Sequence, residues 1–384
     1  MLAPQADLFS LPDDLHYLNA AYMSPLLRSV EAAGIEGVRA KRVPTDLGPA
    51  SFFDAADRVR GLVAQLLDDP DGSDRVALVP AVSYAMATVA QNLTVEAGQT
   101  VVVVAEQFPS HVYPWRRLAA EAGAEVRTVE APGPLGTPGR TDEWNARLLD
   151  AIGPETALVA VPNVHWADGI VFDLAAVGVR CRETGAAFVV DGTQSVGALP
   201  LSVAEVRPDA LAVAGYKWLL GPYGMGALWL GERFRDGRPL EENWIGRAGS
   251  DRFDGLTDYQ DAYAPGAVRF DVGERSNPIL LPMLAAGLDQ ILAWGVGAVQ
   301  ETCRALSDRI VDGARALGYG AADDRAGHLF GLRPPDGASL DAVRRSLDAH
   351  RVSVSVRGGV LRVSPHVYND ATDAEALLAA LGSA

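Results

Sequence analysis

Lysine is almost absent from this chain of 384 residues. Among its 33 basic residues only Lys41 and Lys217 are lysines, so arginine fills nearly every cationic position. A primary amine can add to an aldehyde, whereas a guanidinium stays protonated at any working pH. A lysine that persists against this bias is therefore a candidate for amine chemistry. Lys217 is the stronger one, because it lies in the apolar segment "VAGYKWLLGPYG".

Cysteine and long apolar runs are also scarce. The two cysteines, Cys181 and Cys303, are too few for a disulfide framework or a cysteine-rich metal site. Every apolar run is interrupted before the roughly 18 residues that a membrane helix needs. The N-terminal segment has no basic stretch before an apolar run, which argues against a signal peptide. We therefore expect a cytoplasmic protein with no bound metal and no membrane partner.

A net positive charge is lacking as well. The formal net charge is −16, and no stretch of the chain is strongly basic. Binding to a phosphate backbone needs clustered Lys and Arg, so nucleic acid is not an expected partner. With 48% hydrophobic and 21% charged residues, the composition is that of a folded globular protein.

Short segments that are apolar throughout alternate with helical patterns along the first part of the chain. Five of them occupy residues 75–82, 100–107, 156–163, 186–192 and 209–216. Strands that are apolar on both faces and alternate with helices are typical of a parallel sheet covered on both sides. The fold class predicted is therefore α/β.

Unusual residues follow each of these predicted strands. Because the carboxyl ends of parallel strands meet at one edge of the sheet, where ligands bind, these residues are expected to form a site. In chain order they are Ser83, Phe108, Asn163, Asp191 and Lys217.

Three regions are expected along the chain. Residues 1–50 form an N-terminal segment that contributes to the small domain and the substrate site, and residues 51–265 form the large domain. Residues 266–384 form a smaller α+β domain preceded by a linking helix. The stretch from about 231 to 265 is rich in loops, and a long helix begins near residue 277.

Lys217 and Asp191 point to pyridoxal 5′-phosphate. Apolar surroundings lower the pKa of a lysine amine, which favours its nucleophilic form. A carboxylate at the end of a buried strand is costly unless it is paired, and a protonated pyridine nitrogen would pair with Asp191. Gln194, in the same turn, is expected to reach the phenolic oxygen of the cofactor. A lysine extending to solvent and an aspartate capping a helix are the ordinary alternatives.

A phosphate site is expected where the first strand meets its helix, in "PAVSYAMATVA". Val82 and Ser83 would open this helix, so their backbone amides and the helix dipole favour an anion. Serine is also a common helix-capping residue, and the motif alone is weak.

The segments "VVDGTQSVGALPL" and "AVAGYKWLLGPYGMGALWL" resemble the class V aminotransferases among the fold-type I pyridoxal phosphate enzymes. This superfamily includes kynureninases, cysteine desulfurases, selenocysteine lyases and isopenicillin N epimerase-like proteins. The resemblance spans roughly residues 18–381. It implies a large domain with a mostly parallel seven-stranded sheet, a smaller C-terminal α+β domain, an amino-acid substrate and a homodimer with active sites near the interface.

Several local matches resemble kynureninase. In "EQFPSHVYPW" the resemblance makes Phe108 the residue that stacks on the cofactor, and in "GYKWL" it makes Tyr216 a phosphate ligand. "ENWIG" and "RSNPILL" imply that Trp244 and Asn277 reach the cofactor from the neighbouring subunit. Kynureninases usually have histidine where this chain has Gln194, which argues against kynureninase activity.

"GGVLRVSPHVYND" resembles the segment that carries the superfamily's substrate-binding arginine. Arg362 is the candidate for binding the substrate α-carboxylate, with Arg351 and Arg357 as weaker ones. The loop upstream of this arginine lacks the persulfide-forming cysteine of cysteine desulfurases. Asn163, His165 and Trp166 lie in the segment expected to face the oxygen side of the cofactor, and the sequence leaves open which one points inward.

The function predicted is that of an enzyme that binds an amino acid as an external aldimine, with Lys217 as the residue that transfers protons. Lyase chemistry at a C–S bond or at Cβ is favoured, and amino-group exchange with a keto acid is the alternative. A nicotinamide-dependent oxidoreductase is a remote third reading, because no G-x-G-x-x-G follows a predicted strand. A non-catalytic pyridoxal-binding protein is a fourth.

Overall fold

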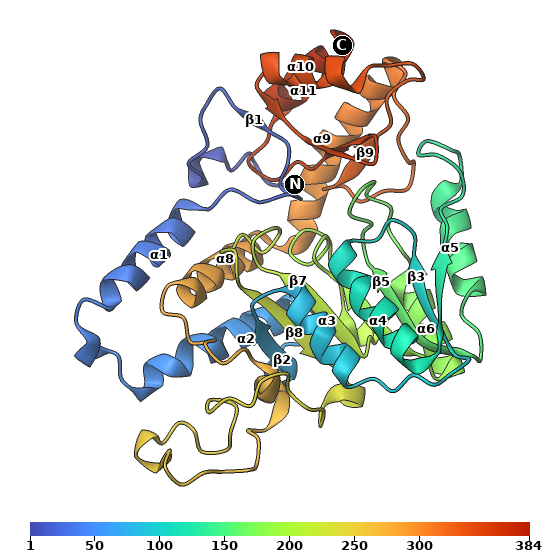
Figure 1. The fold of residues 1–384 in the computed structure, drawn as a ribbon. Coiled ribbons are helices and arrows are strands. Elements are labelled where there is room, and N and C mark those ends of the chain that lie inside the picture. The colour runs from blue at the N-terminus through green and yellow to red at the C-terminus, as the bar shows by residue number, and fades with distance from the viewer.

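A computed structural model describes residues 1–384 and places a seven-stranded sheet at the centre of a large domain, with a smaller domain above it (Figure 1). The strand order is β2-β8-β7-β6-β5-β3-β4; β8 pairs antiparallel with both β2 and β7, and all the other pairs are parallel. The strands are β2 (Val76–Val79), β3 (Thr100–Val104), β4 (Glu125–Val129), β5 (Thr156–Pro162), β6 (Ala187–Asp191), β7 (Ala210–Ala214) and β8 (Gly226–Leu230).

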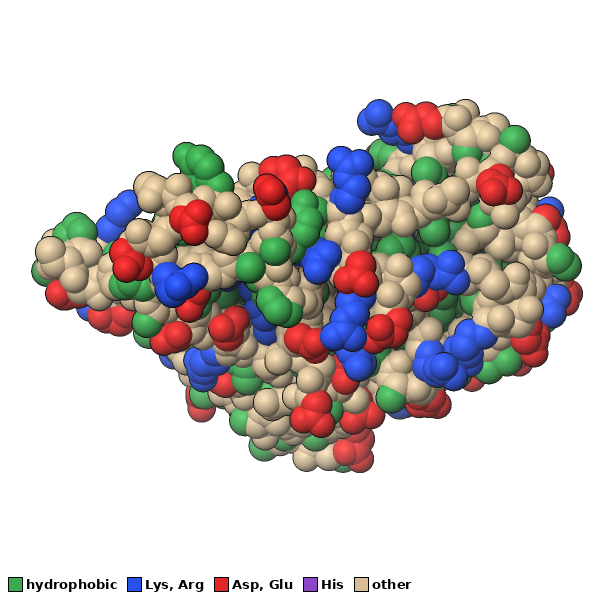
Figure 2. Space-filling view, turned by 90° about the horizontal axis from the view of Figure 1, so that it is seen from below, with side chains coloured by type: hydrophobic (Ala, Val, Ile, Leu, Met, Phe, Trp, Pro, Cys, Tyr) green, Lys and Arg blue, Asp and Glu red, His purple; other side chains and the backbone are tan.

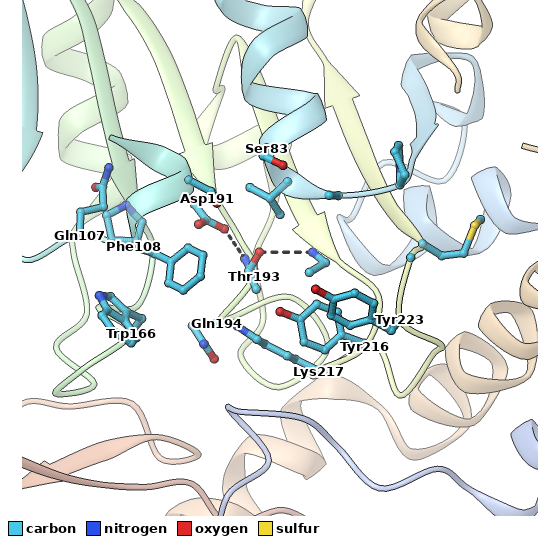
Figure 3. Close-up of a pocket in the computed structure, with 18 of the residues that line it drawn as sticks. Ser83, Gln107, Phe108, Trp166, Asp191, Thr193, Gln194, Tyr216, Lys217 and Tyr223 are labelled. Atoms are coloured by element: carbon cyan, nitrogen blue, oxygen red, sulfur yellow. Dashed lines mark hydrogen bonds between the residues drawn. The ribbon is translucent and has the colours of Figure 1, made fainter. Parts of the chain in front are cut away.

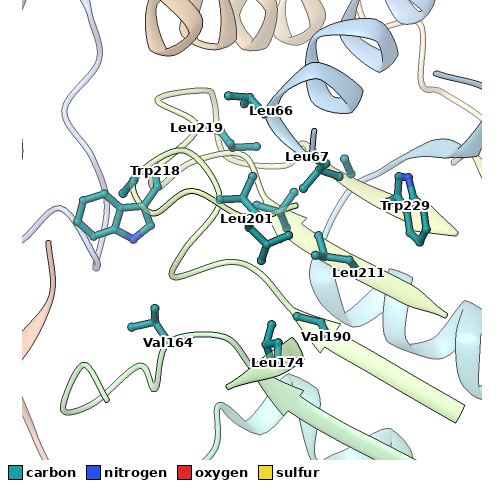
Figure 4. Packing of buried hydrophobic residues seen from close by; sticks show 14 of the residues in the cluster. Leu66, Leu67, Val164, Leu174, Val190, Leu201, Leu211, Trp218, Leu219 and Trp229 are labelled. Atoms are coloured by element: carbon teal, nitrogen blue, oxygen red, sulfur yellow. The ribbon is translucent and has the colours of Figure 1, made fainter. Parts of the chain in front are cut away.

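Helices cover both faces of this sheet. They are α2 (Asp54–Leu66), α3 (Val82–Gln91), α4 (Tyr113–Ala122), α5 (Arg140–Asp150), α6 (Leu174–Thr184), the short α7 (Val203–Val206) and α8 (Leu280–Trp294). Helix α1 (Arg28–Ala40) packs on α8 and extends away from the sheet (Figure 1). In β3, Val101 and Val103 pack with α3 and α4, whereas Val102 and Val104 belong to the core on the other face. Because both sets are buried, each strand is apolar throughout. Figure 4 shows part of the second core around Leu211 and Trp218.

The small domain contains the three-stranded antiparallel sheet β11-β12-β9. Its strands are β9 (Phe330–Leu332), β11 (Ser355–Arg357) and β12 (Val360–Val363), and its helices are α9 (Val296–Ala316), α10 (Leu340–Ala349) and α11 (Ala371–Gly382). Near the N-terminus, β1 (His16–Tyr17) pairs in parallel with β10 (Val352–Ser353), which brings the start of the chain beside the end.

The structure confirms the α/β class and the mostly parallel seven-stranded sheet. Two strands have no counterpart among the five apolar segments. β4 is an edge strand in which only Val129 is fully buried, so it lacks a continuous apolar run. β8 directly follows the glycine-rich loop after Lys217 and returns antiparallel beside β7.

The long helix expected from about residue 277 is two helices. The chain bends by 76° between α8 and α9 at Gly295, whose φ of 77° is left-handed and therefore suits glycine. No single helix is long and apolar enough to cross a membrane, and only this bent pair meets the length and composition criteria when taken together. The stretch 231–265 contains only two short 3₁₀ helices, Glu232–Phe234 and Phe253–Gly255.

Acidic and basic side chains are interspersed on the face of the large domain that points away from the small domain (Figure 2). No single sign of charge covers this face. Exposed arginines of the large domain are paired with neighbouring carboxylates, as in the Arg58–Asp289 and Arg235–Asp74 pairs.

A buried ion cluster fixes the segment that follows the loop-rich stretch. The Asp271 carboxylate accepts hydrogen bonds from Arg60 at 3.0 and 2.5 Å and from the amide of Leu78 at 2.7 Å, and Arg275 lies 3.1 Å away. Asp271 is fully buried, and both arginines are nearly so. Removing the carboxylate therefore leaves Arg275 without an ion-pair partner in the core and leaves Arg60 only Asp57, at 3.4 Å.

We expect Asp271→Asn to lower the free energy of unfolding by about 3–5 kcal/mol, measured by urea denaturation. The matched control is Asp289→Asn, which removes the exposed ion pair with Arg58 and should cost less than about 1 kcal/mol. Equal stability of the two variants would contradict the role of this cluster.

Candidate active site

A cavity of about 210 Å³ opens at the carboxyl edge of the central sheet (Figure 3). Its walls come from the loops after β2, β3, β5, β6 and β7, so chain segments far apart in sequence meet there. The sequence-predicted residues that line it are Val82, Ser83, Phe108, Asp191, Gln194, Tyr216 and Lys217.

Lys217 lies in the turn after β7 with only 6% of its surface exposed. Its Nζ is 5.4 Å from the ring centroids of both Phe108 and Tyr216. Burial lowers the pKa of the amine to about 8, while the negative charge of Asp191 partly opposes this shift. Trp218 is fully buried beside it and anchors the turn in the core (Figure 4). The amine is therefore held in the cavity in a form that is partly unprotonated near neutral pH.

Asp191 is the last residue of β6, and it is 7% exposed. Its Oδ1 accepts a hydrogen bond from the amide of Thr193 at 2.9 Å, and no arginine or lysine forms an ion pair with it. A buried carboxylate without a cation is unfavourable. A protonated pyridine nitrogen bound in the cavity would supply the missing charge, so the site fits a pyridoxal cofactor at this end.

A pyridoxal phosphate also needs a binding site for its phosphate group, and the start of α3 has the features of such a site. The backbone amides of Val82 and Ser83 donate to no acceptor in the protein. Both residues line the cavity, as do Tyr216 and Tyr223, whose ring centroids are 4.7 Å apart. Free amides at a helix N-terminus favour an anion.

Of Asn163, His165 and Trp166, only Trp166 lines the cavity. It lines the cavity, packs edge-to-face on Phe108 at 5.4 Å, and donates from Nε1 to the carbonyl of Glu106 at 2.6 Å. His165 instead bonds to Asp168 at 2.8 Å inside the protein, and Asn163 is buried without lining the cavity. The His165–Asp168 pair therefore supports the loop that carries Trp166.

Gln194 is held by two hydrogen bonds within the protein. Its Oε1 accepts from Trp218 Nε1 at 2.8 Å, and its Nε2 donates to the carbonyl of Ala21 at 3.2 Å. One amide hydrogen remains for a ligand. The expected bond to a phenolic oxygen stays a prediction.

Arg362 lies on β12, 1% exposed, with no carboxylate partner. Arg362 does not itself line the cavity, but its Nη1 donates at 3.1 Å to the carbonyl of Trp166, whose side chain does. Of the weaker candidates, Arg351 pairs with Asp14 at 2.9 Å, whereas Arg357 is half-buried and forms no ion pair.

Trp244 and Asn277 lie outside this cavity. Trp244 is partly exposed and packs edge-to-face on Phe52 and Phe253. Asn277 lies just before α8, and its Oδ1 accepts from the amides of Ile279 and Leu280 at 3.0 Å. A single chain therefore does not bring them to the other site residues, and their role across a subunit interface stays a prediction.

The sequence did not single out Thr193 and Tyr223, which also line the cavity. Thr193 Oγ1 accepts from the amide of Ala214 at 3.2 Å and so ties the Asp191 turn to the strand before Lys217 (Figure 3). Their positions in the sequence could have indicated them. Thr193 lies two residues after Asp191, and Tyr223 lies six residues after Lys217.

No cysteine lines the cavity. Cys181 and Cys303 are buried in α6 and α9, where burial raises the pKa of each thiol to about 12. Such thiols are unreactive, because the thiolate is the nucleophile.

A buried lysine and a buried acid without a cation line one cavity at the carboxyl edge of a mostly parallel sheet, an arrangement that suits a pyridoxal phosphate-dependent enzyme. Residues 49–311 match the model of the family described as Aminotransferase class-V, and the chain belongs to that family. The family and its cofactor-bearing structural neighbours imply pyridoxal 5′-phosphate.

Two curated relatives show what the chain is similar to. A probable cysteine desulfurase of Pyrococcus abyssi is 30% identical over 308 residues, covering 74% of this chain and 72% of the relative. An isopenicillin N epimerase of Amycolatopsis lactamdurans is 28% identical over 393 residues, covering 97% and 96%.

Solved structures of C-DES share the fold. A C-DES mutant with glycine covalently linked to its pyridoxal phosphate cofactor superposes with a TM-score of 0.87 at 20% identity, covering 99% of both chains. The cystine C–S lyase C-DES in complex with its product, cysteine persulfide, gives a TM-score of 0.84 at 21% identity, covering 96% of this chain and 98% of that one.

Proposed function

We propose that this enzyme is a pyridoxal phosphate-dependent lyase that cleaves the bond between Cβ and sulfur in an amino acid. The sulfur would leave as part of a small-molecule product and would not be transferred to a cysteine of the protein. The observation that carries the proposal is the set of titratable groups in the cavity. Lys217 is the only amine there, and neither cysteine nor histidine lines the wall. The protein therefore has a group that moves protons, and it has no thiol to accept sulfur.

The chain's own residues divide the work of holding the cofactor. Lys217 Nζ would bind its aldehyde carbon, Asp191 its ring nitrogen, and the amides of Val82 and Ser83 its phosphate, while Phe108 would cover the ring. When bound, pyridoxal phosphate withdraws electrons from the substrate Cα and makes its proton acidic. Arg362 would bind the α-carboxylate through two parallel hydrogen bonds.

Lys217 is suited to move that proton. An amine with a pKa of about 8 exchanges protons readily near neutral pH, which is the requirement for a general acid and base. Nζ would take the proton from Cα and later return a proton to the product. Phe108 has no polar side-chain atom, and the single N–H of Trp166 already donates to the carbonyl of Glu106. These two side chains therefore do not compete with Lys217 for protons.

The similarity to the C–S lyase C-DES and to cysteine desulfurases supports sulfur chemistry. The buried state of Cys181 and Cys303 argues against a protein-bound persulfide, because neither thiol can reach the cavity. Amino-group exchange with a keto acid is the second candidate. It begins with the same proton transfer at Cα, and the family is described as Aminotransferase class-V.

A panel of amino acids assayed with the holoenzyme separates the two candidates. We expect cystine, which is a disulfide, or a thioether amino acid to yield pyruvate, ammonia and a sulfur product without any added keto acid. The Cys181→Ser and Cys303→Ser variants should retain this activity within about twofold, because neither thiol takes part. Turnover that requires a keto acid and forms no pyruvate from the sulfur substrate would establish the aminotransferase instead.

A further inference from the structure

Two arginines without carboxylate partners converge on one aromatic ring beside the cavity. The guanidinium carbons of Arg357 and Arg362 lie 5.7 and 5.8 Å from the ring centroid of Trp166, which itself lines the cavity. They come from β11 and β12, adjacent strands of the small sheet. Two cations this near one another repel, so an unpaired arrangement favours the binding of anions.

The hydrogen bonds of both side chains leave donors free. Arg362 donates to the carbonyl of Trp166 and to Ser355 Oγ at 3.4 Å, while its buried Nε has no partner. Arg357 makes one hydrogen bond, from Nη1 to the neighbouring carbonyl of Val356 at 2.9 Å. A buried donor without a partner is unfavourable, and a bound carboxylate would satisfy it.

The α-carboxylate of a substrate would pair with only one of these two arginines. If Arg362 binds the α-carboxylate, the Arg357 guanidinium, 5.7 Å from the same Trp166 ring, remains without an anionic partner. Arg357 also lines a wider groove of about 670 Å³ together with Asn19 and Tyr22, so it borders both the groove and the Trp166 wall of the cavity. A substrate side chain leaving the cavity along Trp166 would meet Arg357.

We infer that the substrate carries a second acidic group on its side chain, a carboxylate or a sulfur oxyacid, and that Arg357 binds it. This inference deepens the proposed function, since it rests on Arg362 binding the α-carboxylate. Arg357 would then determine specificity, because a neutral side chain would leave its charge unpaired next to Arg362.

Binding of unreactive diacids to the holoenzyme tests this inference without relying on turnover. The probes are succinate with succinamate and glutarate with glutaramate, pairs that differ in one carboxylate and lack the amino group needed for reaction. In calorimetric titrations we expect at least one diacid to bind about tenfold or more tighter than its monoamide. Arg357→Gln should remove that preference, and Arg357→Lys should retain part of it.

Arg309→Gln is the matched control, because it removes an exposed arginine of the same domain that pairs with Glu375 and lines neither the cavity nor the groove. It should leave the preference unchanged. Equal binding of diacid and monoamide, a preference that survives Arg357→Gln, or failure of both diacids to bind would each overturn the inference. A diacid preference in an enzyme that proves to be an aminotransferase would overturn only the proposed lyase function.

Discussion

Replacing Lys217 by alanine is expected to abolish covalent attachment of pyridoxal 5′-phosphate and to lower kcat/KM by at least about 10³-fold. The reason is that one amine both holds the cofactor and transfers protons, and each role is lost with it. The side chain lies in a cavity, 6% exposed, so its removal leaves space that the cofactor and water can occupy. We therefore expect the variant to fold and to bind the cofactor noncovalently.

The scarcity of lysine makes this experiment unusually clear. Borohydride reduction of the holoenzyme, followed by digestion and mass spectrometry, should place the pyridoxyl group on Lys217 and leave Lys41 unmodified. Lys41 follows the last residue of α1 and is exposed, so Lys41→Arg is the matched control and should retain labelling and turnover. Modification of Lys41 alone, or full turnover by Lys217→Ala, would refute the assignment.

Much of the site could be predicted because its residues follow strands. Asp191 ends an apolar run and Lys217 follows another, and a parallel sheet brings such ends together whatever the loops do. The structure places both in one cavity with Phe108 and Ser83, which come from two other strands. Local sequence and sheet geometry are sufficient for this part of the site.

The remaining residues depend on contacts between distant segments, which sequence patterns do not encode. Gln194 bonds to Ala21 of the N-terminal segment, and Arg362 bonds to Trp166 across the two domains. The sequence could not show which of Asn163, His165 and Trp166 lines the cavity. His165 is turned away from it because it bonds to Asp168, which in turn pairs with Arg140. The position of Arg357 beside the same ring is a property of the small sheet's register.

Asp191→Asn is expected to lower kcat/KM by about 10²- to 10³-fold. Asparagine keeps the shape of the side chain but cannot pair with a protonated ring nitrogen, and losing one partner of a buried ion pair costs about 3–5 kcal/mol. The matched control is Asp209→Asn. Asp209 accepts a hydrogen bond from the amide of Phe188 at 2.8 Å, at the opposite end of the same sheet, and should change turnover by less than about twofold.

A second readout separates this role from a merely structural one. The negative charge of Asp191 raises the pKa of Lys217, against the larger lowering effect of burial. Removing that charge should therefore move the pKa of the amine below about 8. In the apoprotein, the pH at which the rate of cofactor attachment reaches half its maximum should fall in Asp191→Asn and stay unchanged in Asp209→Asn. An unchanged midpoint in both variants would mean that Asp191 and Lys217 do not act on the same ligand, and the assignment of the site would have to be abandoned.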